Sequence, residues 1–121
     1  MGLSWDEAIA HALSLPDAVR SGDLSASGIM VASNKRVFLF PGREAPTSFV
    51  LTLDRDTVEM LKETDPATFY QTPHYMGWDG VLVRHDTDDP ERVRAMIDAA
   101  RDYSAAKKPA RPRKKAPRKA A

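Results

Sequence analysis

Two aspartates directly after an apolar segment have the spacing that could most readily support catalysis. Asp54 and Asp56 follow the apolar run 49–53. In phosphoryl transfer one such carboxylate can attack phosphorus while the second acts as the acid and base. The same pair is typical of a helix start, where Asp54 would accept hydrogen bonds from free backbone amides. The chain is short for such a phosphatase and has no evident later lysine and acidic metal pair. We therefore favour the helix cap and predict no enzymatic activity.

Further carboxylates and the histidines could suggest a metal site. The acids are Asp86, Asp88, Asp89 and Glu91. A calcium loop needs a central Gly and a Glu at its twelfth position, and this segment has neither. Pro90 among these acids is instead typical of a first helical position, where acids are stabilised by the helix dipole. The histidines lack the spacing of metal ligands and stand at His11, His74 and His85. Because the chain also has no cysteine, we expect no metal and no cofactor.

A rigid aromatic segment is the candidate for a small pocket. Pro73 and Tyr75 flank His74, and Trp78 follows. A histidine in a cleft can serve a ligand, although a histidine hydrogen-bonded to backbone is the interpretation that we favour. Tyr70, Tyr75 and Trp78 could also form a surface on which bases stack. Packing of the sheet against a helix is the favoured role of these rings, because buried aromatics dominate core energetics.

The charge of the chain is divided unequally between two segments. The formal net charge is +1. The body, residues 1–106, holds ten Lys and Arg against all seventeen Asp and Glu, which leaves −7. The tail, residues 107–121, holds eight cations and no acid, which gives +8. The cations of the tail are Lys107, Lys108, Arg111, Arg113, Lys114, Lys115, Arg118 and Lys119. This asymmetry predicts a tail that binds a polyanion.

The tail is expected to be disordered and to contact nucleic acid. It contains only Lys, Arg, Pro and Ala, so it has almost nothing to bury and its like charges repel. The run 112–119 resembles the tails of linker histones and bacterial histone-like proteins. Lys and Arg displace condensed counterions from nucleic acid, and proline keeps the chain extended. A solubility segment and a contact with an acidic protein or an anionic membrane are the alternatives.

A smaller group of cations lies in the body. A hairpin turn is predicted at 33–35. Lys35 stands in this turn, Arg36 follows it, and Arg43 stands in the loop after the hairpin. Such a hairpin could contact a phosphate backbone, while a solvated turn is the interpretation that we favour.

The elements that must position these residues follow from local signals. Ser4 and Glu7 form a capping box, so a helix is expected from there until Pro16. Apolar runs predict strands, and acids that precede a helical pattern predict two further helices. The strands are expected at 28–32, 37–40, 49–53, 69–70 and 79–84, and the later helices at 54–63 and from Asp89 onward. Grouped strands with short connections indicate an α+β fold, in which a mainly antiparallel sheet of about five strands packs against three helices.

Several short motifs in the body resemble those of the MmcQ/YjbR family. They are Thr72-Pro73-His74-Tyr75, Trp78, the run 81–84, the run 51–54 and the helix after Asp89-Pro90. The resemblance covers about residues 4–106 and leaves out the basic tail. It implies a compact two-layer α+β domain of the double-wing type with a presumed DNA-binding role, and it implies no catalytic residues.

Together these patterns predict a non-enzymatic, DNA-associated protein whose binding is largely non-specific. The tail should supply most of the affinity, since the acidic body is repelled by DNA unless its charges are segregated by face. The alternative is a protein-interaction module with an acidic body and a basic tether. No apolar run approaches the ~20 residues of a membrane span, and residues 1–6 do not form a secretory signal. We therefore expect a cytoplasmic, bacterial protein that could associate with the nucleoid.

Overall fold

The first helix begins at the capping box that the sequence predicts. The computed structural model describes residues 2–21, 28–41, 47–73 and 75–108. In α1 (Trp5–Leu13) the Glu7 amide donates to Ser4 Oγ at 3.1 Å, and the Ser4 amide donates to Glu7 Oε1 at 2.9 Å. Each side chain thereby satisfies a backbone donor that the first helical turn leaves free. The helix ends at Leu13, before the Pro16 that we expected to stop it.

The other two helices also start at aspartates. Asp54 caps α2 (Arg55–Thr64), and Asp89 caps α3 (Pro90–Ala105), where Pro90 occupies the first turn. Both carboxylates accept a hydrogen bond from the backbone amide three residues later, as an N-cap requires. None of the described helices has both the length and the apolar composition of a membrane span.

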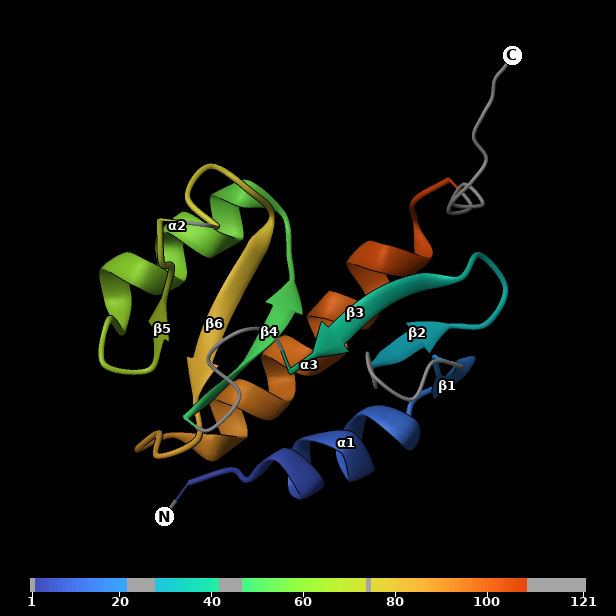
Figure 1. Ribbon diagram of the computed structural model, residues 1–121, viewed down its shortest axis with the longest axis horizontal. Coiled ribbons are helices and arrows are strands. Elements are labelled where there is room, and N and C mark those ends of the chain that lie inside the picture. The colour runs from blue at the N-terminus through green and yellow to red at the C-terminus, as the bar shows by residue number, and fades with distance from the viewer. Residues whose placement is uncertain (1, 22–27, 42–46, 74, 109–121) are drawn as a thin grey trace.

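The strands form one antiparallel sheet, as Figure 1 shows. They are β1 (Ala18–Arg20), β2 (Ile29–Val31), β3 (Arg36–Phe40), β4 (Ser48–Thr52), β5 (Phe69–Tyr70) and β6 (Gly80–Arg84). Their order is β1-β2-β3-β4-β6-β5, and every neighbouring pair is antiparallel. The predicted α+β fold with an antiparallel sheet and three helices is thus confirmed, with six strands in place of about five.

The additional strand is β1, in a region that carries no sequence signal of a strand. Ala18, Val19 and Arg20 pair with the three residues of β2 at the edge of the sheet. The side chain of Val19 is 38% exposed, so this strand buries little apolar surface. Three residues at an edge are too few to show the alternation from which strands are predicted.

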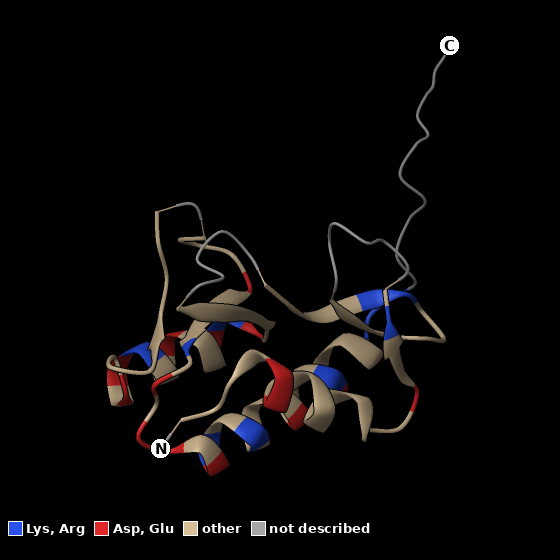
Figure 2. Ribbon diagram, turned by 60° about the horizontal axis from the view of Figure 1, so that its bottom comes forward, with Lys and Arg blue, Asp and Glu red and all other residues tan. Residues whose placement is uncertain are grey.

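The helices pack on one face of the sheet and build the main core there. One buried cluster joins Ala8 and Ile9 of α1, Leu61 of α2 and Ile97 of α3 to the strands. Figure 2 shows the helices together on one side of the sheet. The largest fully buried side chains are Phe38, Phe49 and Phe69. Burying each of them contributes about 2–3 kcal/mol, so this face carries most of the stability.

The opposite face of the sheet has a smaller cluster and no helix within the described residues. Val50 and Leu82 are buried there beneath Tyr75, with Phe40 and Tyr70 packed at the margin. Val37 and Val19 are 36% and 38% exposed. We call this side the open face of the sheet.

Candidate nucleic-acid interface

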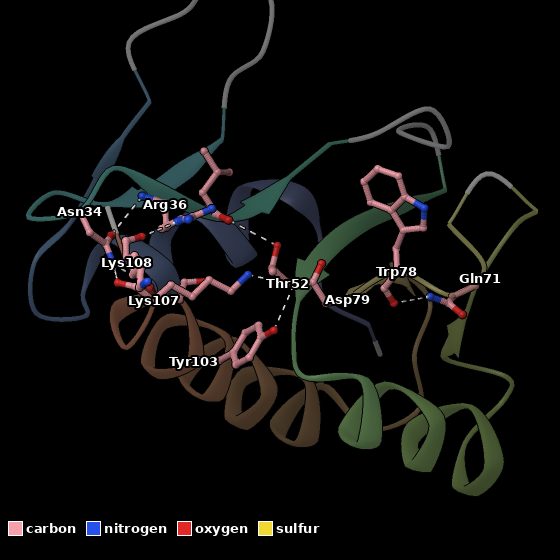
Figure 3. A network of polar contacts seen from close by, with 11 residues as sticks. Asn34, Arg36, Thr52, Gln71, Trp78, Asp79, Tyr103, Lys107 and Lys108 are labelled. Atoms are coloured by element: carbon pink, nitrogen blue, oxygen red, sulfur yellow. Dashed lines mark hydrogen bonds and ion pairs between the residues drawn. The ribbon is translucent and has the colours of Figure 1, made fainter. Parts of the chain in front are cut away.

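The turn between β2 and β3 holds the end of α3. The Asn34 side-chain amide donates to the carbonyl oxygens of Ser104 at 2.8 Å and Lys107 at 3.2 Å. Its Oδ1 accepts the backbone amide of Arg36 at 3.1 Å. Asn34 is only 7% exposed. The last carbonyls of a helix have no partner within the helix, so Asn34 supplies the donor that this helix end needs (Figure 3).

The same contacts bring two groups of cations together. Arg36 Nε donates to the carbonyl oxygen of Lys108 at 2.8 Å. Lys35 occupies the same turn in the left-handed backbone region, with φ of 60°. Lys35, Arg36, Lys107 and Lys108 therefore lie at one end of the molecule, which we call the basic end. The sequence presents the hairpin and the tail as separate candidates, more than 70 residues apart.

An acid beside the basic end is already paired. Lys107 Nζ lies 2.9 Å from Asp79 Oδ2, and the Tyr103 hydroxyl donates to the same oxygen at 3.1 Å. Lys107 Nζ also lies 4.5 Å from the centre of the Tyr103 ring. Burial, followed by the charge of Asp79, raises the pKa of the Tyr103 hydroxyl above its usual value, so this group remains a donor. The Asp79 carboxylate is thus neutralised from within the fold.

Two further acids lie close to this end. Asp17 Oδ2 accepts the Ser33 amide of the β2–β3 turn at 3.1 Å, and Asp102 is in an ion pair. Asp102 Oδ1 lies 2.9 Å from Arg101 Nη1, and Arg101 Nε donates to the Pro16 carbonyl at 3.0 Å. Figure 2 shows blue ribbon where the C-terminal segment leaves the fold, and much of the red ribbon on the helices. Several cations thus lie together at one end of the molecule, while other Lys and Arg lie on α2 and α3 (Figure 2).

The aromatic segment presents one ring to the core and one to solvent. Tyr75 is 9% exposed and packs on Val50 and Leu82, whereas Trp78 is 65% exposed. The expectation of core packing is confirmed for Tyr75 and wrong for Trp78. Gly77, at φ of +82°, lets the chain turn between them in a conformation that other residues rarely adopt. The structure therefore does not bring Tyr75 and Trp78 together in one pocket. His74, the third residue of the predicted pocket, lies outside the described residues.

One face of the Tyr70 ring is already in contact with an arginine. The Arg84 guanidinium carbon lies 4.0 Å from the centre of the Tyr70 ring, and the Tyr70 hydroxyl is 2.7 Å from Ser48 Oγ. An arginine over a tyrosine face is a favourable cation–π contact. Of the aromatic side chains predicted to form a stacking surface, Trp78 is the one that the fold exposes.

Asp54, considered for catalysis, and Asp89, considered for a metal site, both act as helix caps. Asp54 Oδ2 accepts the Thr57 amide at 3.1 Å, and Asp54 Oδ1 accepts the Thr57 hydroxyl at 2.6 Å. The hydroxyl hydrogen bond holds the pKa of Asp54 below its usual value, against the opposing effect of burial. Asp89 accepts the Arg92 amide at 3.1 Å. Within the described residues, no three His, Asp or Glu side chains are grouped so that they could hold a metal ion.

The two described histidines, His11 and His85, contact other side chains of the fold. His11 Nε2 lies 2.7 Å from Asp98 Oδ1 and links α1 to α3. The His85 ring stacks on Phe49 with centroids 5.7 Å apart, and burial lowers its pKa. Open hollows lie beside His85, and one of them, of about 290 Å³, is also lined by Thr47, Arg84 and Asp86. Trp78 does not line either hollow.

Comparisons with known proteins do not assign the chain to a family. No protein-family model, no curated protein and no solved structure matches the chain. The resemblance to the MmcQ/YjbR family therefore stays a prediction.

Part of the predicted interface lies outside the described residues. This part consists of Arg43, Arg111, Arg113, Lys114, Lys115, Arg118 and Lys119. The contribution of Asn34 was not foreseen, because its partners stand some 70 residues away in the sequence. The predicted turn at 33–35 was the only local signal in this region.

Proposed function

We propose that this chain is a non-enzymatic, DNA-associated protein that binds the phosphate backbone through its basic end and the tail that continues from it. The observation that carries the proposal is the attachment of Lys107 and Lys108 to the hairpin turn through Asn34 and Arg36. This attachment fixes where the tail leaves the body. Residues 109–121 then add six further Lys and Arg with no acid.

The mode of binding follows from the chemistry of these groups. Ammonium and guanidinium groups that neutralise phosphates release condensed counterions, and this release dominates non-specific affinity for DNA. A guanidinium carries five N–H donors, and Arg36 uses one of them for the Lys108 carbonyl. Contacts to phosphates set position and carry no sequence information. The expected result is strongly salt-dependent binding with little sequence preference, in the compartment that holds the chromosome.

The test is a DNA-binding titration over a series of salt concentrations. For the full chain on duplex DNA, neutralisation of about 5–8 phosphates gives a slope of log K against log salt of about −4 to −7. A chain that ends at Lys108 keeps every described element but loses six cations. Its slope should become about −2 or shallower, and its affinity near 0.1 M salt should fall by at least about 100-fold.

The matched control is a full-length chain in which the six cations of 109–121 are replaced by Gln. It has the native length and should behave like the truncated chain. Retained affinity with an unchanged salt slope in either variant would refute the proposal.

A further inference from the structure

Trp78 is displayed on the open face of the sheet. Its side chain is 65% exposed, and the neighbouring Met76 is 58% exposed. Figure 3 shows the indole projecting away from the helices, while the polar network of the basic end lies beside the end of α3. A large aromatic side chain left in water is a candidate contact for a partner with an apolar surface.

The backbone beneath Trp78 is firmly held. The Trp78 amide donates to the Tyr75 carbonyl at 2.9 Å. The Gln71 side-chain amide donates to the Tyr75, Trp78 and Gly80 carbonyls at 2.9, 3.3 and 2.8 Å. Tyr75 itself is buried in the small cluster on the open face. The indole therefore extends from a turn that is fixed at both ends, which reduces the entropy lost when a partner binds.

Gly80 explains how this turn fits against the sheet. A Cβ atom at Gly80 would lie 3.3 Å from the Tyr75 ring and 3.4 Å from a Val50 methyl group. The absence of a side chain lets Tyr75 lie close to the start of β6. The glycine thus allows Tyr75 to be buried, while Trp78 remains exposed.

The residue that follows Trp78 links this turn to the basic end. Asp79, the next residue, is paired with Lys107 at 2.9 Å. Lys107 leads directly to Lys108, whose carbonyl is held by Arg36. Thr52 pairs with Gly80 across β4 and β6 and donates to the Val37 carbonyl at 3.3 Å. The exposed indole thus connects to the basic end through adjacent residues, with its neighbouring carboxylate neutralised.

We propose that Trp78 stacks on an unpaired base, so that the basic end and the open face together hold a segment of single-stranded DNA. The proposal rests on the proposed function, and it specifies the form of nucleic acid. Base faces in a duplex are already covered by neighbouring base pairs, so an indole can stack only on a base that is unpaired. Aromatic stacking combined with cations that follow the backbone is the general means of binding single strands without sequence preference.

The experiment compares a thymidine oligonucleotide of about 15 nucleotides, roughly one binding site, with a duplex that carries the same number of phosphates. Full-length Trp78→Ala should bind the single strand about 5-fold or more weakly, the lower end of the range for loss of one stacked base. Its affinity for the duplex should stay within about 2-fold, because the duplex offers only phosphates to this protein. Trp78→Phe should restore most of the single-strand affinity.

Met76→Ala is the matched control. Met76 is exposed on the same turn and is apolar, but it has no aromatic face. This variant should change neither affinity by more than about 2-fold, since stacking depends on a π-face.

Fluorescence gives a second readout that does not depend on affinity. The chain has two tryptophans, Trp5 and Trp78. In a Trp5→Phe background the remaining indole should be quenched by the single strand and not by the duplex. Trp5 packs on Phe49 at a ring distance of 6.0 Å, so thermal unfolding should be recorded to show that this background is folded.

The outcomes separate this proposal from the proposed function. If the full chain binds neither form of DNA, the proposed function fails, and this inference fails with it. If binding is tail-dependent but Trp78→Ala weakens both forms equally or neither, only the stacking site is overturned. Loss confined to the single strand, with rescue by Phe, supports it.

Discussion

Acids begin α3, whereas cations from residues 35–36 and 107–108 lie beside its end. At its start, Asp89 accepts the Arg92 amide, and the Asp89 amide donates to the buried Thr87 hydroxyl at 3.0 Å. At its end, the carbonyls are already satisfied by the Asn34 amide, yet Arg36 and Lys108 accumulate there as well. Both distributions complement the helix dipole. The acids complete the helix start, whereas the cations exceed what the helix end needs.

This difference shows how a body with a net charge of −7 can carry a basic interface. The acids that begin α3 belong to a helix cap at one end of the molecule (Figure 1). Of the acids near the basic end, Asp79 is paired with Lys107 and Asp102 with Arg101. Asp17 accepts the backbone amide of Ser33. Exposed charges farther apart than about 10 Å are largely screened at 0.1 M salt. Local charge at the basic end therefore matters more for DNA than the total charge of the body.

The largest expected effect on stability comes from the basic end. Asn34→Ala removes a buried amide and leaves the Ser104 carbonyl without this donor. An unsatisfied buried polar group costs about 1–3 kcal/mol, so the free energy of unfolding should fall by that amount. Urea denaturation monitored by circular dichroism measures it.

A second variant at this position sharpens the result. Asn34→Asp keeps an acceptor for the Arg36 amide but loses the donors to Ser104 and Lys107. It should be destabilised at least as much as Asn34→Ala, because an anion then faces the helix carbonyls. Stability close to that of the parent chain in both variants would show that Asn34 does not fasten the basic end.

At the acidic end the expected effect is smaller. Asp89→Ala removes the N-cap of α3 and should lower the free energy of unfolding by about 1 kcal/mol. Asp89→Asn should lose only a few tenths of a kcal/mol, because Asn caps helices nearly as well. Neither variant should change the affinity for DNA by more than about 2-fold, since the proposed phosphate contacts are at the other end. Clearly tighter binding by Asp89→Asn would mean that the acidic end repels DNA and that the two ends are not independent.

The features that could be predicted from the sequence are those decided within a few residues. Ser4, Asp54 and Asp89 each accept the backbone amide three positions later, so their roles as caps can be read locally. Strand β1 could not be predicted, because Ala18–Arg20 becomes a strand only through pairing with β2. The cations at 35–36 and 107–108 could be identified separately, but their meeting depends on contacts across more than 70 residues.

In the aromatic segment, too, contacts within the fold decide what the sequence does not predict, here over only a few residues. Tyr75 and Trp78 are three residues apart and both aromatic, and the sequence favours burial for both. The positive φ of Gly77 and the hydrogen bonds of Gln71 hold the turn so that Tyr75 is buried and Trp78 is exposed. Those contacts are properties of the folded turn.

The central claim is that the position of the cations, and not the net charge, determines binding to DNA. Two full-length variants with equal net charge test it. One is Arg36→Gln with Lys108→Gln at the basic end, and the other is Arg55→Gln with Arg94→Gln on α2 and α3. The measurement is the slope of log K against log salt on duplex DNA for both variants and the parent chain.

The account predicts that the first variant has a slope shallower than that of the parent chain by about 2, since each lost phosphate contact removes about 0.9. The slope of the second should change by less than about 0.5. Equal slope changes in the two variants would contradict the account, because binding would then follow total charge alone.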